Sequence, residues 1–268
     1  MKFSGAVVRT ILAFVALVAI QTVIGILLPL KTPPVPHQMP WLLLSNAVMA
    51  GAMSFAAVRS EWRGWRLGAA LSGIALAILT VDVIEGVFFL KNLQIEWGRI
   101  FLIALIGSLL MVPVWALLFG RRPESTAHYH PIEAKSRGER AWKFALSDLT
   151  YLFLYFTAGA IIFPFVKSFY ATQQLPAMGP IIGMQLLVRG PVFVMVCLGL
   201  TRMLGLPRLR GAFAVGMVFT LITGWVVDHY SYTPVFIGFG VLPLIASLIL
   251  WIFAGPLRPG VSSPAAVR

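Results

Sequence analysis

Two acidic side chains inside an apolar segment are the residues of this chain best placed to do chemistry. Asp82 and Glu85 lie within Leu67–Leu90, which holds no other charged residue. An acidic group at membrane depth is costly, and it usually faces the interior of a helix bundle or a water-filled cavity. A spacing of three residues puts both carboxylates on one face of a helix. The two acids therefore mark a candidate functional site.

A basic side chain and an amide are expected at a similar depth. Arg189 lies inside the apolar segment 180–200, and Gln185 precedes it by one helical turn. With a rise of ~1.5 Å per residue, Asp82 lies ~22 Å along its helix, and Arg189 lies ~12 Å below the outer membrane edge. We therefore expect Asp82 and Arg189 to be within reach of each other.

A later apolar segment, 211–230, adds two more polar residues. It ends in Asp228 and His229, at the depth expected for Glu85. We interpret the whole set as a substrate-binding site, and we assign no catalytic residue and no metal ligand. The members of this site are Asp82, Glu85, Gln185, Arg189, Asp228 and His229.

Each of these residues also has a structural interpretation. Glu85, Asp228 and His229 are expected near a membrane surface, where water can solvate them. Asp82 and Arg189 are too deep to reach a helix end easily. The alternative for these two is an ion pair that locks two helices together and has no other role.

Composition places the chain among membrane proteins. Hydrophobic residues make up 59% of the chain and charged residues 11%, with a mean hydropathy of +0.89. These values lie far outside the range of a soluble domain. The net charge of +12 comes from basic residues beside apolar segments rather than from one basic face, so we expect no nucleic-acid partner. A single cysteine, Cys197, excludes an intramolecular disulfide.

The elements that must position the site are membrane-spanning helices. A hydrocarbon core of ~30 Å requires ~20 apolar residues per helix. The chain is expected to be an all-α polytopic membrane protein with about eight transmembrane helices. Their expected ranges are 7–30, 40–58, 67–90, 100–119, 144–166, 180–200, 211–230 and 234–254.

These helices are expected to form two tandem four-helix halves. A constant offset aligns Gly73 with Gly216, Thr80 with Thr223 and Glu85 with Asp228, although biased composition can produce such matches by chance. Halves of four helices share one orientation, which is the parallel-repeat geometry of some secondary carriers. The expected divisions are 1–119 for the first half, 120–142 for a cytoplasmic linker, 143–255 for the second half and 256–268 for a disordered cytoplasmic tail.

The distribution of basic residues predicts the orientation of the chain. With eight spans, nearly all Lys and Arg residues outside the spans fall on one side, including the Arg121–Lys143 loop. By the positive-inside rule, that side is the cytoplasm, so both termini are expected there. The compact loops and the strong charge bias favour a bacterial inner membrane.

Two local features are expected near the site. Asp148 follows Ser147 near the start of the segment 144–166, and we interpret Ser147 as a helix cap and Asp148 as a partner of the helix dipole. Pro191 removes a backbone hydrogen bond two residues after Arg189. We therefore expect a kink in this helix beside the charge.

One stretch is similar to a known family. Residues 222–236, read as ITGWVVDHYSYTPVF, with Gly238 and Leu242-Pro-Leu-Ile-Ala246, resemble the last helix pair of major facilitator transporters. The stretch covers under a fifth of the chain, and about eight spans are too few for that twelve-helix family. The resemblance implies transport by analogy and does not carry over the fold.

We expect a carrier or flippase-type transporter whose polar site lies in the outer half of the bundle. Its expected partners are membrane lipids and a small solute or an anionic lipid, and no cofactor is expected. The first alternative is a non-catalytic membrane subunit or scaffold that packs against a membrane protein partner.

The third interpretation is a membrane enzyme that acts on lipid phosphates. The acids would hold a divalent ion and Arg189 would bind the phosphate. The chain lacks the His-Glu-x-x-His and Gly-x-Ser-x-Gly motifs. His128 and His130 with Glu133 match no pattern that specifies a metal, and we interpret them as part of a solvated loop.

Overall fold

A computed structural model describes residues 3–30, 38–89, 96–120, 136–171 and 176–204. Within these residues the secondary structure is entirely helical. The helices are α1 (Phe3–Leu27), α2 (Gln38–Arg59), α3 (Gly64–Phe89), α4 (Trp97–Phe119), α5 (Arg137–Tyr170), α6 (Met178–Met184), a π-helical turn η1 (Gln185–Arg189) and α7 (Gly190–Leu204).

Five helical spans in the described part of the chain are long and apolar enough to cross a membrane. The fifth is a single span of 27 residues that consists of α6, η1 and α7 in succession. The expected all-α class is confirmed, and the five spans suggest a chain that is embedded in a membrane. The five spans are Ser4–Leu27, Leu42–Arg59, Gly64–Phe89, Trp97–Phe119 and Met178–Leu204.

The expected number of about eight spans is met only in part. The expected span 144–166 falls within α5, which is not among the five. The expected spans 211–230 and 234–254, with the tail 256–268, lie outside the described residues. The division into two four-helix halves therefore stays a prediction.

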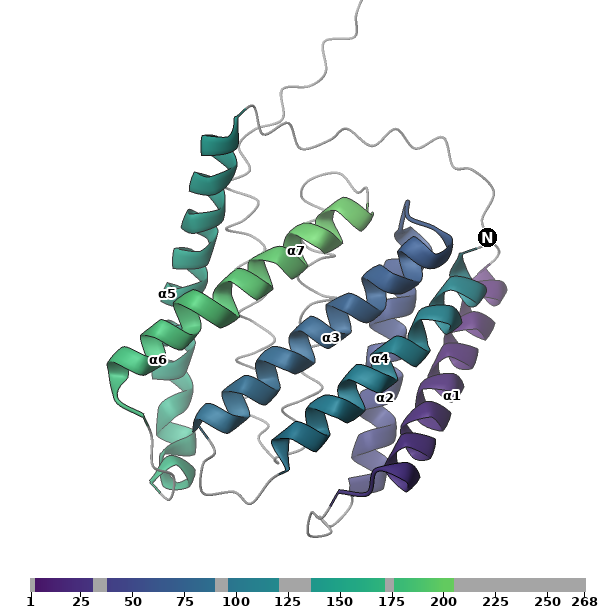
Figure 1. Cartoon of the computed structure of the whole chain (residues 1–268), viewed down its shortest axis with the longest axis horizontal. Coiled ribbons are helices and arrows are strands. Elements are labelled where there is room, and N and C mark those ends of the chain that lie inside the picture. The colour runs from purple at the N-terminus through teal and green to yellow at the C-terminus, as the bar shows by residue number, and fades with distance from the viewer. Residues whose placement is uncertain (1–2, 31–37, 90–95, 121–135, 172–175, 205–268) are drawn as a thin grey trace, which may run out of the picture.

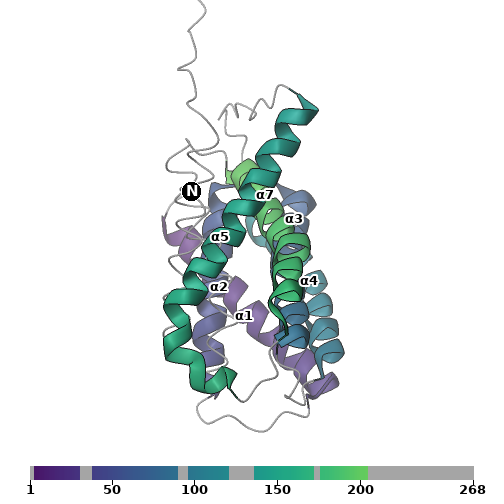
Figure 2. The same ribbon diagram turned by 90° about the vertical axis from the view of Figure 1, so that its left-hand side faces the viewer.

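The helices lie side by side, with α7 between α3 and α5 (Figure 1). The hairpin of α3 and α4 makes the most extensive contact, and α1 packs against α2 and α4. Viewed from the side, α5 runs across the face of α7 at an angle (Figure 2). The span α6–η1–α7 thus joins α5 to α2 and α3.

The core is formed by α1, α2, α3, α4 and α7, and α2 contributes several small side chains to it. Ala52 and Ala56 of α2, Leu67 and Leu71 of α3 and Leu200 of α7 belong to one cluster of buried apolar residues. In lipid, van der Waals packing drives helix association, so small residues that let backbones approach are favoured at such contacts. Large apolar side chains on the outside, such as those of α1, remain exposed for contact with lipid.

The start of α5 differs from the expected one. The helix begins at Arg137, inside the expected linker, where the Ser136 hydroxyl accepts a hydrogen bond of 3.1 Å from the Glu139 N–H. Ser136 is therefore the N-terminal cap. Ser147 donates instead to the Lys143 carbonyl at 2.7 Å, in the helix interior. The interpretation of Ser147 and Asp148 as a helix start was wrong, because the charged turns Arg137–Lys143 extend the helix beyond its apolar part.

Gly68 determines how closely α3 and α4 approach. A β-carbon at this position would overlap the backbone carbonyl oxygen of Val112, which cannot move aside as a flexible side chain could. Gly73, on the same helix, has no atom within 4 Å of the corresponding position. The two glycines therefore form a matched pair for testing this contact.

We predict that Gly68→Ala destabilises the protein by about 1–3 kcal/mol, because overpacking forces the two helices apart. The measurement is the thermal midpoint of the purified protein in detergent, followed by fluorescence-detected size exclusion. Gly73→Ala serves as the control and should leave the midpoint nearly unchanged. Equal midpoints for both variants would show that the α3–α4 contact is looser than described.

Candidate functional site

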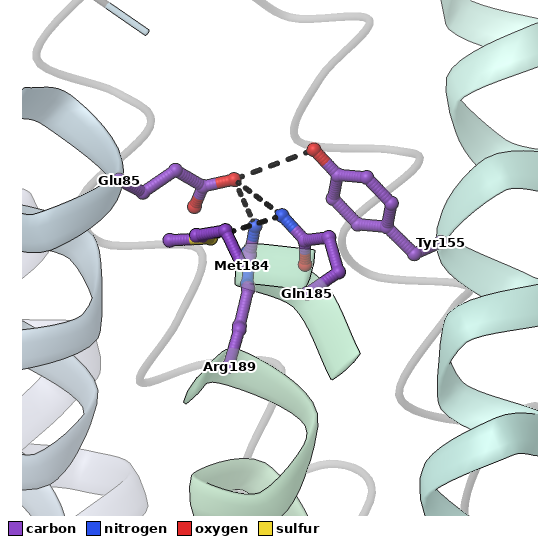
Figure 3. Close-up of polar contacts among 5 residues, drawn as sticks. All are labelled: Glu85, Tyr155, Met184, Gln185 and Arg189. Carbon is purple, nitrogen blue, oxygen red and sulfur yellow. Dashed lines mark hydrogen bonds and ion pairs between the residues drawn. The ribbon is translucent and has the colours of Figure 1, made fainter. Parts of the chain in front are cut away.

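A buried ion pair joins two helices that are far apart in the sequence. The guanidinium of Arg189, at the end of η1, pairs with the carboxylate of Glu85, near the end of α3 (Figure 3). Arg189 is 1% exposed, whereas the Glu85 side chain keeps 20% of its surface exposed. The pair therefore lies at the contact between α3 and the α6–η1–α7 span, with the cation deeper than the anion.

Two more donors point at the same carboxylate oxygen (Figure 3). The Tyr155 hydroxyl on α5 donates to Glu85 Oε1 at 3.4 Å, and Gln185 Nε2 donates to it at 3.4 Å. Both distances are long for hydrogen bonds, so each contributes little beside the ion pair. Their significance is geometric, because they bring α3, α5 and η1 to one point.

Aromatic rings surround the guanidinium. The Arg189 Cζ atom lies 5.0 Å from the centre of the Phe193 ring and 5.4 Å from that of Tyr155. Tyr151 packs edge-on against Phe193, with 5.5 Å between ring centres. A cation near ring faces is attracted by their quadrupoles, and the attraction grows when water is excluded. The rings therefore help to hold Arg189 away from water.

A π-helical turn positions Gln185 and Arg189. The Gly190 N–H donates to the carbonyl of Gln185, five residues back. Pro191 follows at once and has no N–H to give, and a proline ring collides with the carbonyl four residues before it in a regular helix. The wider turn accommodates both effects, so the expected kink at Pro191 takes the form of a π-turn. Such turns are frequent at functional sites.

Asp82 lies one turn before Glu85 on α3 and forms no ion pair with a described residue. It is close enough to act electrostatically on both Glu85 and Arg189. Its Oδ2 atom is buried and accepts no hydrogen bond from the described residues. We expected Asp82 to reach Arg189 from a depth estimate that treated the spans as straight helices ending at the same level. The carboxylate that pairs with Arg189 is instead that of Glu85, one turn farther along α3.

The structure thus brings four of the expected site residues together. Glu85, Gln185 and Arg189 are in direct contact, and Asp82 lies next to them. Asp228 and His229 lie outside the described residues, so their part in the site stays a prediction.

Sequence reasoning missed the contribution of α5. Tyr151 and Tyr155 were not expected near the site, because aromatic residues in an apolar helix are most often ordinary packing residues. Their spacing from Asp148, three and seven residues, places all three on one face of α5. This polar stripe was the signal that could have identified them.

Asp148 and Gly190 form the contact between α5 and the start of α7. Asp148 is 7% exposed, and its Oδ1 atom is buried without a hydrogen-bond partner among the described residues. A β-carbon on Gly190 would overlap this oxygen. Glycine is therefore required for α5 to lie this close to the π-turn, two helical turns from Tyr155.

No metal site is evident in the described residues, which contain no group of three or more His, Cys, Asp or Glu able to hold an ion. The segment with His128, His130 and Glu133 lies outside them. Two open grooves lie elsewhere, one between α1 and α4 and one between α3 and α7, and mainly apolar side chains line them. The polar cluster is thus a contact between packed helices and not part of either groove.

Comparisons with protein-family models, with curated protein sequences and with solved structures found no match to this chain. The chemistry of the site therefore has to be argued from its own residues.

We predict that Glu85→Gln and Arg189→Gln each destabilise the protein by about 3–5 kcal/mol, because each leaves a buried charge without the partner it has now. The double variant should recover much of this loss, since it removes both charges. Thermal midpoints of the four proteins in detergent give the coupling energy.

The exposed pair Glu139–Lys143, with side chains 35% and 37% exposed, provides the control for this cycle. Glu139→Gln should change stability by about 0.5 kcal/mol or less, as expected for a solvated helix pair. Additive losses at Glu85 and Arg189 would mean that the two residues do not act as a pair.

We also predict that Gly190→Ala is destabilising and that Asp148→Ala relieves the effect. The added β-carbon collides with the Asp148 carboxylate, and overpacking of this kind costs about 1–3 kcal/mol. The measurement is again the thermal midpoint, for both single variants and the double variant. If Asp148→Ala does not improve the Gly190→Ala protein, the collision involves a different group.

Proposed function

We propose that the chain is a carrier or flippase-type transporter in which Arg189 and Glu85 form the centre of the substrate site. The observation that carries this proposal is the buried ion pair at the meeting point of α3, α5 and η1. Charged residues within membrane spans are costly, and they commonly mark the paths of ions or substrates. Because Glu85 is partly exposed and Arg189 is buried, the arrangement suits replacement of the Glu85 carboxylate by an anionic group of a substrate.

The pair also suggests how binding would be coupled to movement. A carboxylate or phosphate group on the substrate can replace Glu85 on the guanidinium, because Arg binds such groups through two parallel hydrogen bonds. Glu85 of α3 pairs with Arg189 and accepts a hydrogen bond from Gln185, both of η1, so its release would loosen α3 from the α6–η1–α7 span. Substrate binding would thereby favour a second arrangement of the helices.

The proposed location is a bacterial inner membrane, with both termini in the cytoplasm and the site in the outer half of the bundle. Support comes from basic residues at one end of the described helices. Arg59 ends α2, Arg66 lies in the first turn of α3, Arg140 lies near the start of α5 and Arg202 lies in the last turn of α7. These ends lie on the same side of the bundle, away from the end of α3 that carries Glu85 (Figure 1).

The test is transport by the full chain in phospholipid vesicles. Two kinds of probe distinguish a flippase from a carrier of small solutes. The first is a fluorescent phosphatidylglycerol, whose movement is followed by dithionite bleaching, and the second is radiolabelled inorganic phosphate or dicarboxylates. We predict that the wild type moves one kind of probe. Arg189→Gln should reduce the rate by at least about tenfold, because truncating one partner of a buried charge pair costs 2–5 kcal/mol or more.

The matched control is Arg202→Gln, which removes an exposed arginine from the last turn of the same span. It should transport at the wild-type rate. Rates that are equal in Arg189→Gln and wild type would contradict the proposal. In that case, a membrane protein that co-purifies with the wild type would favour the subunit interpretation, in which the ion pair only holds helices together.

A further inference from the structure

The charges around Arg189 do not balance. In the apolar segments 67–90, 144–166, 180–200, 211–230 and 234–254, Arg189 is the only Lys or Arg residue. The same segments contain four acids, two of which, Asp82 and Glu85, lie beside Arg189. One guanidinium between two carboxylates leaves an excess of one negative charge at this point.

Buried oxygen atoms at the same point lack donors. Asp82 Oδ2 is buried and accepts no hydrogen bond from the described residues. Gln185 is fully buried at 0% exposure, and its Oε1 atom also has no partner among them, although its Nε2 atom donates to Glu85. An unsatisfied buried polar atom costs roughly 1–3 kcal/mol, so two of them beside an excess carboxylate indicate a missing positive group.

We propose that Asp82, together with Glu85 and Gln185, binds one monovalent cation, H⁺ or Na⁺. One added positive charge brings the summed charge of the two carboxylates and Arg189 to zero, whereas a divalent ion would leave an excess positive charge. Carboxylate and amide oxygens are hard ligands that suit a small cation, and a carboxylate is equally able to take a proton. The site lies next to the substrate position, so the cation is the coupling ion of the proposed transporter, and in that role it rests on the proposed function.

The groups that face Asp82 come from three elements. Glu85 is on its own helix, Arg189 comes from η1, and Tyr151 comes from α5. Gln185 of η1 reaches the same cluster through its hydrogen bond to Glu85. Of these, Glu85 favours cation binding, and Arg189 opposes it. Because Arg189 is already paired with Glu85, the net field at Asp82 is that of one guanidinium balanced by one carboxylate.

The test measures cation binding directly on the full chain in lipid nanodiscs. In one arm, radiolabelled Na⁺ is titrated at fixed pH, with K⁺ as the competitor. In the other arm, infrared difference spectra at high and low pH, in H₂O and D₂O, report the carbonyl stretch of a protonated carboxylic acid. Saturable Na⁺ binding identifies sodium, and a pH-dependent carboxylic band without Na⁺ binding identifies the proton.

Asp82→Asn should abolish whichever signal the wild type gives. Asp148→Asn is the control, because it removes another buried acid two turns from Tyr155 and should leave the Asp82 signal in place. If Asp82→Asn does not fold, Asp82→Glu should keep the signal with a shifted midpoint. The inference is overturned if neither signal depends on residue 82, or if Asp82→Glu gives the wild-type midpoint.

Failure here is distinguishable from failure of the proposed function. Cation binding that depends on Asp82 in a protein that moves no probe would contradict transport alone. Transport that depends on Arg189 in a protein with no cation signal at Asp82 would contradict the coupling site alone.

Discussion

The need to pair Arg189 governs the arrangement of the described helices. A guanidinium that is 1% exposed inside a membrane span must find an anion, because an isolated charge in a medium of low dielectric is very costly. Glu85 supplies the anion from α3, and aromatic rings of Tyr155 and Phe193 exclude water around the cation. The same contact therefore holds three helices together and creates the polar centre of the bundle.

The backbone around this contact is adapted to it. The π-turn brings Gln185 and Arg189 to the junction, and Pro191 explains why a regular helix is disfavoured there. Directly after the turn, the absence of a side chain at Gly190 lets Asp148 and α5 approach. Local chain geometry and helix packing thus favour the same position for the charged pair, and each depends on the other.

The sequence predicted the all-helical class of the fold and most residues of the polar cluster, because both follow from burial costs. Apolar length identifies membrane helices, and polar or charged side chains within them identify Glu85, Gln185 and Arg189. It did not predict which acid pairs with Arg189, since that depends on helix tilt and on the π-turn. The start of α5 was missed because apolar length does not register the charged turns at Arg137. Tyr155 was missed because an aromatic side chain gives the same pattern in a core and in a site.

The π-turn also changes the register of its own span. A π-turn is equivalent to one extra residue in an α-helix, and each residue of a regular helix turns the face by ~100°. For residues after Gly190, helical-wheel counting from Met178 is therefore wrong by one residue. Each of them faces the direction that the count would give to its neighbour in the sequence. Any sequence with a regular helix in this span would need a gap of one residue to keep Phe193 and Cys197 aligned on their buried side.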